Sequence, residues 1–350
     1  LGPDHPSTLT CMDNLARGYH AAGNLDLALP LYEETLKLKK AKLGPDHLST
    51  LTTMHNLAEG YKVADNLDLA LPLFEETLKR MKAKLGPDHH ETLTTMNNLA
   101  ASYWRARKLT QSIPLFEEGL KLQEKKLGRS HPETQLTVAN LGVNYKDADH
   151  LNEALPLLEE AYRASRTIPN LHWVGAQLLA GYAQSGKATE AVGLTNELVA
   201  EARKTLPKES AQLAGTLAQY GFTLLQVKSF TDAELLLREC LAIREKQQPV
   251  AWPTFNTQSL LGHALLGQQK YADAEPLLLK GYEGLKEREK TIPPQAKDRI
   301  PEALDRLIDL YTATDKPDEV KKWQADRGEV SRNQTGRQQM KQGKWLPPGL

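Results

Sequence analysis

The chain has 350 residues, and its 44 Lys and Arg balance its 44 Asp and Glu, so its formal net charge is zero. Because it lacks an excess of positive charge, it lacks the uniform field that drives non-specific binding to nucleic acids. We therefore expect neither a nucleic acid nor a membrane surface as its partner. No apolar stretch approaches the roughly 18 residues that a membrane-spanning helix needs.

The sequence repeats itself with a fixed period. Leu-Gly-Pro-Asp-His begins at Leu1, Leu43 and Leu85, and the variant Leu-Gly-Arg-Ser-His begins at Leu127, so each start lies 42 residues after the previous one. A period of this length is typical of arrays in which one supersecondary unit stacks on the next. Because the first residue is Leu and lies in the middle of the repeat register, we expect this chain to be part of a longer polypeptide.

Each repeat is expected to contain two antiparallel helices. In the first repeat, apolar residues recur at spacings of three and four from Leu9 to Tyr19, and Gly23-Asn24 then interrupts the pattern. A second helix is predicted from about Leu25 to Leu43. Pairs of glutamates in these second helices, such as Glu33-Glu34, precede a lysine such as Lys37 and predict ion pairs one turn apart.

Eight such units fit the chain when they are aligned on their apolar residues. An aromatic or leucine recurs at one position of the first helix, where it is expected to fill the space between repeats: Tyr19, Tyr61, Tyr103, Tyr145, Tyr182, Leu224, Leu265 and Tyr311. The predicted repeats lie near residues 1–42, 43–84, 85–126, 127–167, 168–205, 206–247, 248–290 and 291–327. Residues 328–350 lack an apolar stripe and are predicted to form a disordered tail.

This spacing of large, small and aromatic residues resembles the tetratricopeptide repeat. The LGPDH turn, Asn-Leu-Ala and Ala-Leu-Pro-Leu resemble the kinesin light chain version over residues 1 to about 167. The stretches from Ala274 to Leu285 and from Arg299 to Tyr311 look like repeat regions of bacterial serine/threonine protein kinases. The resemblance implies an all-α solenoid, a right-handed superhelix of about eight antiparallel helix pairs whose first helices line an inner groove.

The two cysteines, Cys11 and Cys240, both fall within helical apolar patterns five repeats apart. We therefore expect both to be reduced core residues in a reducing compartment, which favours a cytoplasmic location.

Two patterns could be mistaken for catalytic or metal-binding motifs. Gly181 to Lys187 has the spacing of a phosphate-binding loop, but Ala188 replaces the hydroxyl that binds magnesium, and the stretch continues a helix. Asp-His pairs such as Asp4-His5 recur one repeat apart, which is too far for ligands of one zinc ion, so we interpret them as helix starts with Asp as a possible cap. We therefore expect a protein that is not an enzyme and that needs no cofactor or metal.

A series of carboxamides is the strongest candidate for a binding site. It lies immediately before the packing leucine or its equivalent in six successive repeats: Asn14, Asn56, Asn98, Asn140, Gln177 and Gln219. A carboxamide both donates and accepts hydrogen bonds, as an extended peptide backbone requires. In kinesin light chains the resembling Asn contributes to binding of cargo peptides, which implies such a role for the four asparagines; the two glutamines are our extension. The alternative is that these amides connect neighbouring repeats.

Trp104 and Arg105 follow the packing aromatic of the third repeat. A Trp beside a guanidinium is a plausible anchor for a peptide with acidic and apolar residues, whereas the alternative is that Trp104 fills the junction with the fourth repeat. The sequence thus favours a non-catalytic scaffold that binds a protein or peptide partner in its groove. The second hypothesis is that the array is the recognition arm of a bacterial serine/threonine protein kinase whose catalytic domain lies upstream.

Overall fold

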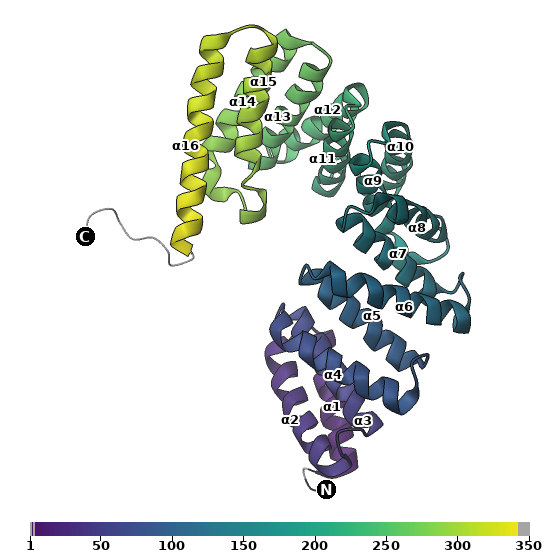
Figure 1. Ribbon diagram of the computed structural model, residues 1–350. Helices are drawn as coiled ribbons and strands as arrows, with labels where there is room; N and C mark the ends of the chain where they lie inside the picture. Colours follow the sequence, from purple (N-terminus) through teal and green to yellow (C-terminus); the bar gives the residue numbers. More distant parts are fainter. Residues whose placement is uncertain (1, 3, 342–350) are drawn as a thin grey trace, which may run out of the picture. The chain divides into compact units, whose positions relative to one another are not determined.

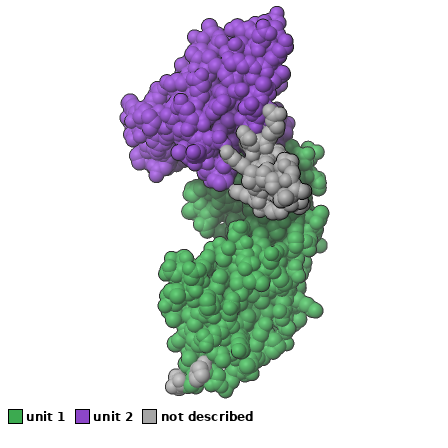
Figure 2. All heavy atoms as spheres, turned by 90° about the vertical axis from the view of Figure 1, so that its left-hand side faces the viewer, with its two compact units in different colours: residues 1–181 green, residues 182–350 purple. Residues whose placement is uncertain are grey.

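The structure is a computed structural model that describes residue 2 and residues 4–341, with side chains as far as residue 330. Its described residues form sixteen α-helices and three short 3-10 segments and contain no strand (Figure 1). The chain divides into two compact units, residues 1–181 and 182–350, called unit 1 and unit 2 below (Figure 2).

Unit 1 consists of four helix pairs and the start of a fifth. Its elements are α1 (Pro6–Ala21), α2 (Leu25–Leu43), α3 (Leu48–Val63), α4 (Leu67–Leu85), α5 (His90–Arg105), α6 (Leu109–Leu127), α7 (Pro132–Asp147), α8 (Leu151–Ala164), η1 (Pro169–Leu171) and most of α9 (Val174–Gln184). From α1 to α8, each helix packs against the next one along the chain.

Unit 2 continues the alternation of first and second helices. It contains α10 (Ala188–Thr205), α11 (Ala211–Gln226), α12 (Phe230–Gln247), α13 (Trp252–Gly267), α14 (Tyr271–Glu287), η2 (Glu289–Thr291), η3 (Pro294–Ala296), α15 (Arg299–Ala313) and α16 (Pro317–Lys341). The sixteen helices form the all-α array of eight pairs that the sequence predicted.

Helix starts in unit 1 depend on histidine. The Nδ1 atoms of His5, His47, His89 and His131 accept a hydrogen bond from the backbone N–H two residues later, so each histidine caps a first helix. The Asp-His pairs thus lie at helix starts, as predicted, but the cap is His and not the Asp that we considered possible. The Asp4 carboxylate instead pairs with Lys42 Nζ at 2.9 Å.

Turns between the two helices of a pair need a residue with left-handed backbone. That position is Gly23 in the first repeat and Asp65, Arg107 and Asp149 in the next three, with φ between 59° and 77°. Of these four residues, only the glycine predicts a turn from the sequence, because glycine adopts the left-handed conformation readily and other residues rarely do.

The glutamates of the second helices do not form the predicted ion pairs with lysines one turn later. The hydroxyl of Tyr61 donates to Glu33 Oε1 at 2.5 Å and that of Tyr103 to Glu75 Oε1 at 2.6 Å, and Tyr145 donates to Glu117 in the same way. These partners are 28 residues apart in each case and lie in neighbouring repeats. A hydrogen-bonded tyrosine in the next repeat therefore replaces the exposed lysine as the partner of this glutamate.

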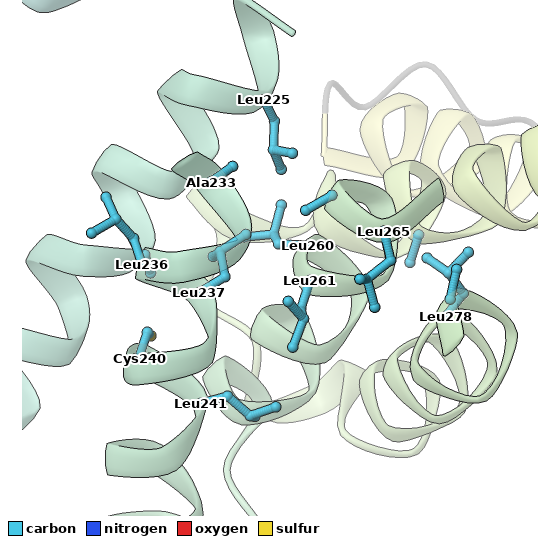
Figure 3. Packing of buried hydrophobic residues seen from close by; sticks show 14 of the residues in the cluster. Leu225, Ala233, Leu236, Leu237, Cys240, Leu241, Leu260, Leu261, Leu265 and Leu278 are labelled. Carbon is cyan, nitrogen blue, oxygen red and sulfur yellow. The ribbon is translucent and has the colours of Figure 1, made fainter. Parts of the chain in front are cut away.

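The apolar core differs between the units. Unit 1 holds local clusters, one from Ala16 to Met81 and one from Ala58 to Tyr103. In unit 2, a single cluster of buried residues runs from Val199 to Trp323 and includes Cys240, Leu237 and Leu261 (Figure 3).

Two expectations about single segments were wrong. Cys240 is buried, but Cys11 is exposed, because within the described residues no helix precedes α1 to cover it. Helix α16 continues to Lys341, although we expected the tail to begin at residue 328. Gln, Arg, Lys and Glu favour helix even without an apolar face, and no proline interrupts the segment. The rest of the predicted tail, 342–350, lies outside the described residues.

Candidate functional site

First helices of successive repeats form one face of unit 1. Helix α1 packs against α3, α3 against α5, and α5 against α7, whereas the second helices make fewer contacts with one another. The first helices of neighbouring repeats therefore pack on one another along one side of unit 1. We call this surface the first-helix face; the predicted carboxamides of unit 1 are on its helices.

The asparagines of the first-helix face differ in how far the protein itself uses them. Asn14 is exposed, and its Oδ1 accepts from Arg17 on the same helix at 2.8 Å. Asn56, Asn98 and Asn140 are half-buried. Asn98 Nδ2 lies 3.4 Å from Nε2 of His55, a long contact. The side chains of Asn56 and Asn140 form no hydrogen bond with any residue that the structure describes.

The two glutamines behave differently from the asparagines. Gln177 Oε1 on α9 accepts a hydrogen bond from Lys146 Nζ at 2.9 Å, so this amide connects two neighbouring repeats. Gln219 belongs to unit 2, where its side chain is exposed on α11 and bonds to no described residue. Of the six predicted carboxamides, Gln177 thus forms the short hydrogen bond between neighbouring repeats, whereas Asn14 bonds within its own helix.

The repeats of unit 1 are connected through a different position, which the sequence pattern did not predict. In the first three repeats, the residue just before the carboxamide reaches a threonine on the next first helix: Thr53 donates to Asp13 Oδ1 at 2.7 Å, His55 Nδ1 lies 2.9 Å from the Thr95 hydroxyl, and Asn97 Nδ2 donates to Thr137 at 2.9 Å. The acid, imidazole and amide share no chemical type, so only the repeated threonine marks this layer in the sequence. Because this layer makes the connections, the asparagines beside it are available for other contacts.

The second helices complete this polar layer with a different residue in each repeat. Lys39 is 2% exposed, and its Nζ donates to Thr53 at 2.8 Å and lies 3.5 Å from Asp13. Burial lowers the pKa of Lys39, and the charge of Asp13 opposes this shift. Met81 and Gln123 take the place of Lys39 in the next two repeats, and Met81 Sδ accepts from Thr95 at 3.2 Å.

Trp104 and Arg105 form bonds within the fold. Trp104 Nε1 donates to Asp147 Oδ2 on α7 at 2.7 Å, which ties α5 to the next first helix. Arg105 reaches back to α3 and its turn, where it donates to the Lys62 carbonyl at 3.0 Å and to Asp65 Oδ1 at 2.8 Å. Both polar groups are occupied, so any partner contact would use the exposed parts of these side chains.

A cavity of about 190 Å³ lies between α3, α4 and α5. Thr52 and Thr94 line it, one helical turn before Asn56 and Asn98, together with His55 and Met81. Burial lowers the pKa of His55, so its imidazole is neutral at pH 7. The cavity thus places hydroxyl and imidazole groups beside the two asparagines.

The other candidate motifs have structural roles. Gly181 lies within α9, Gly186 adopts a φ of 70° in the turn that follows, and Lys187 is the N-cap of α10. The phosphate-loop spacing is therefore a helix end followed by a helix start. Within the described residues, no group of His, Cys, Asp and Glu could hold a metal ion, and none of the helices there is long and apolar enough to cross a membrane.

Comparisons with known proteins agree with this fold. The tetratricopeptide repeat family model matches residues 1–41, 18–83, 49–125 and 91–167. A search of curated proteins finds no sequence that matches the chain.

Solved structures resemble the chain at low sequence identity. The apo form of RapI is 12% identical, with a TM-score of 0.62 over 97% of this chain and 99% of that one. A signal transduction ATPase with a tetratricopeptide repeat sensor, from Pyrococcus horikoshii, is 15% identical, with a TM-score of 0.57 over 84% of this chain and 44% of that one. A putative kinesin light chain from Podosopora anserina is 23% identical over 70% of this chain and 98% of that one, with a TM-score of 0.38.

The family match, the array of helix pairs and the two solved structures with TM-scores of 0.62 and 0.57 agree about the architecture. The chain therefore carries tetratricopeptide repeats in residues 1–167 and folds as an all-α solenoid of the tetratricopeptide type.

Proposed function

We propose that the chain is a non-catalytic protein-interaction scaffold whose first-helix face in unit 1 binds an extended segment of a partner protein. Asn56, Asn98 and Asn140 would hold the backbone of that segment. The supporting observation is that Asn56 and Asn140 bond to no described residue, whereas His55, just before Asn56, contacts the Thr95 hydroxyl of the next repeat. An amide that the fold does not use is available to a peptide N–H or C=O.

The chemistry of the face suits an extended backbone better than a small substrate. Asparagines recur at one position on successive first helices, and the residues beside them in the cavity are Thr52, Thr94 and the neutral His55. These groups donate and accept hydrogen bonds, as a peptide backbone requires, and Glu91, which also lines the cavity, adds one acidic group.

The test uses peptides selected from a random display library against the intact chain. Replacing Asn56, Asn98 and Asn140 together by Ala should weaken binding of the selected peptides by about 0.5–1.5 kcal/mol per hydrogen bond lost. The melting temperature should stay close to that of the parent. Fluorescence anisotropy and thermal melts measure the two quantities.

The matched control is Asn97→Ala, one residue away from Asn98. Because Asn97 bonds to Thr137 across the repeat junction, this change should lower the melting temperature and leave peptide affinity unaltered. The proposal fails if the triple variant binds as tightly as the parent, or if it loses stability and Asn97→Ala does not.

The second candidate function is a recognition arm in a signalling enzyme. The likeness of residues 274–285 and 299–311 to repeat regions of bacterial serine/threonine kinases favours it, and so does the tetratricopeptide sensor named in the Pyrococcus horikoshii ATPase. The genomic sequence upstream of Leu1 tests this: a kinase domain in the same reading frame supports the arm, whereas further repeats alone support the scaffold.

A further inference from the structure

Unit 2 contains a cavity of about 320 Å³ whose wall includes part of the long connection between α14 and α15. Helices α11, α12, α13 and α15 and the connection between α14 and α15 contribute to its wall. Two arginines, Arg244 and Arg299, line it together with Phe222 and Trp252, and no acidic residue is among its lining residues. The cavity is therefore positively charged with aromatic walls.

The connection between α14 and α15 gives the cavity its wall on one side. In unit 1, a short turn such as Gly44 to His47 joins a second helix to the next repeat, but here the two segments η2 and η3 are inserted. The insertion brings Ala296 to the cavity and places the Arg299 guanidinium 4.8 Å from the ring centre of Phe222 on α11. The cavity is thus preformed in the folded chain.

Arg244 is a fixed cation without an acidic partner. Its Nη1 donates to the Pro253 carbonyl at 2.8 Å and to the Thr257 hydroxyl at 2.6 Å, which holds the guanidinium in place. It forms no ion pair with any residue that the structure describes, and burial lowers its pKa. Arg299 differs, because Glu302 accepts from it at 2.8 Å.

Asn256, in the same wall as Arg244, has a side-chain oxygen without a hydrogen-bond partner. The residue is 8% exposed, its Oδ1 is buried, and its side chain bonds to no described residue. A buried amide without partners costs free energy unless a ligand supplies them. Gln219, with an unbonded amide, lines the same cavity.

We propose that this cavity binds an acidic side chain of a polypeptide, with the carboxylate on Arg244 and the adjacent backbone N–H on Asn256. A guanidinium supplies the paired N–H donors that a carboxylate accepts, and Oδ1 of Asn256 accepts the N–H. Phe222 and Trp252 would pack against the methylene groups of the acidic residue. Every residue involved lies in unit 2, so this site is independent of the first-helix face.

The test titrates Ac-Gly-Glu-Gly-NH2 into the full chain and follows the indole N–H of Trp252 by NMR. The neutral peptide Ac-Gly-Gln-Gly-NH2 has nearly the same shape, and we expect it to bind at least tenfold more weakly. Equal binding of the two peptides, or no shift of the Trp252 resonance with either, overturns the proposal. Tighter binding of Ac-Gly-Gly-OH than of the Glu peptide also overturns it, because the cavity would then select a chain terminus.

Asn256→Asp separates binding from folding. The new carboxylate has the size of the amide and supplies the anion that Arg244 lacks, so the variant should melt no lower than the parent while its affinity for the Glu peptide falls at least tenfold. Asn196→Asp adds the same charge at an exposed site on α10, away from the cavity, and should leave the affinity unchanged. Unaltered affinity in Asn256→Asp overturns the proposal, and the wild-type comparison of Glu and Gln peptides decides it if that variant does not fold.

Discussion

Units 1 and 2 use the same helix pair in two different ways. In unit 1, the contacts recur with the sequence: the tyrosine–glutamate bond appears three times at one spacing, and a threonine occupies one position in three successive interfaces. In unit 2, buried residues from Val199 to Trp323 join into one cluster, and an insertion between two helices encloses a cavity. The repeats of unit 1 therefore keep the tyrosine, glutamate and threonine positions while other residues vary, whereas in unit 2 the insertion adds a wall to one cavity.

The largest effect that tests this comparison comes from the aromatic between repeats. Tyr103 in unit 1 and Tyr311 in unit 2 are 7% and 3% exposed, and each hydroxyl donates to a glutamate of the preceding repeat. Replacing either by Ala should lower the free energy of unfolding by about 3–5 kcal/mol. Replacing either by Phe removes only the hydrogen bond and should cost about 0.5–1.5 kcal/mol.

Hydrogen exchange measures which helices lose stability in each Tyr→Ala variant. Because unit 1 has local clusters, Tyr103→Ala should reduce protection mainly in α4, α5 and α6, whereas Tyr311→Ala should reduce it from α11 to α16. If the loss of protection extends over equally many helices in the two variants, the two units do not differ in cooperativity.

The next effect depends on pH. Burial, reinforced by the charge of Arg306, lowers the pKa of His263 in unit 2 to about 4, below the value of 6.5 for an exposed histidine. The unfolded chain therefore binds a proton that the folded chain does not, so this stabilisation is present above about pH 6.5 and is lost as the pH falls towards 4. The loss from this residue is at most about 3 kcal/mol.

His263→Gln should flatten this pH dependence. Urea unfolding at pH 7 and pH 4.5 measures the difference, with the parent as reference. Burial also lowers the pKa of His55 in unit 1, so His55→Gln should act in the same direction. A His263→Gln variant that loses as much stability in acid as the parent would show that other groups dominate.

The smallest effect concerns how closely the helices approach. A Cβ at Gly281 would lie 2.7 Å from the backbone nitrogen of Ser259, so the backbones of α13 and α14 would have to separate. A Cβ at Gly119 on α6 would meet only side-chain atoms of Asn97 and Met96, at 3.0 and 3.3 Å.

Gly281→Ala should therefore cost about 1–3 kcal/mol in unit 2. At Gly119, the gain in helix propensity of about 1 kcal/mol offsets the crowding, so Gly119→Ala should change stability by less than that. Thermal melts of the two variants check the contrast, which is contradicted if Gly119→Ala proves the more damaging.

The helix array could be predicted from the sequence because its signals repeat. A fixed period, apolar spacings of three and four and a recurring aromatic each specify the same helix pair. The turn residues Asp65, Arg107 and Asp149 could not be predicted, because nothing in their side chains demands the left-handed backbone that the register imposes on them.

The candidate sites were predictable to different degrees. The carboxamide series is visible as a pattern of one residue type, but the layer beside it contains Asp13, His55 and Asn97, which share no chemistry. The cavity of unit 2 was missed entirely, since its parts come from four helices and an insertion. Only the folded chain places Arg299 over Phe222.

The bond from Tyr61 to Glu33, and its two equivalents, have a consequence for how such an array can grow. Each bond joins an acid in one repeat to a tyrosine in the next, so an excised helix pair contains half of two bonds and the whole of none. A duplication of one full period of 42 residues adds one new tyrosine and glutamate at the same spacing of 28 residues, so the bonds between repeats are kept. The contact between two neighbouring repeats therefore recurs with the same period as the helix pair, and growth of the array by whole periods preserves it.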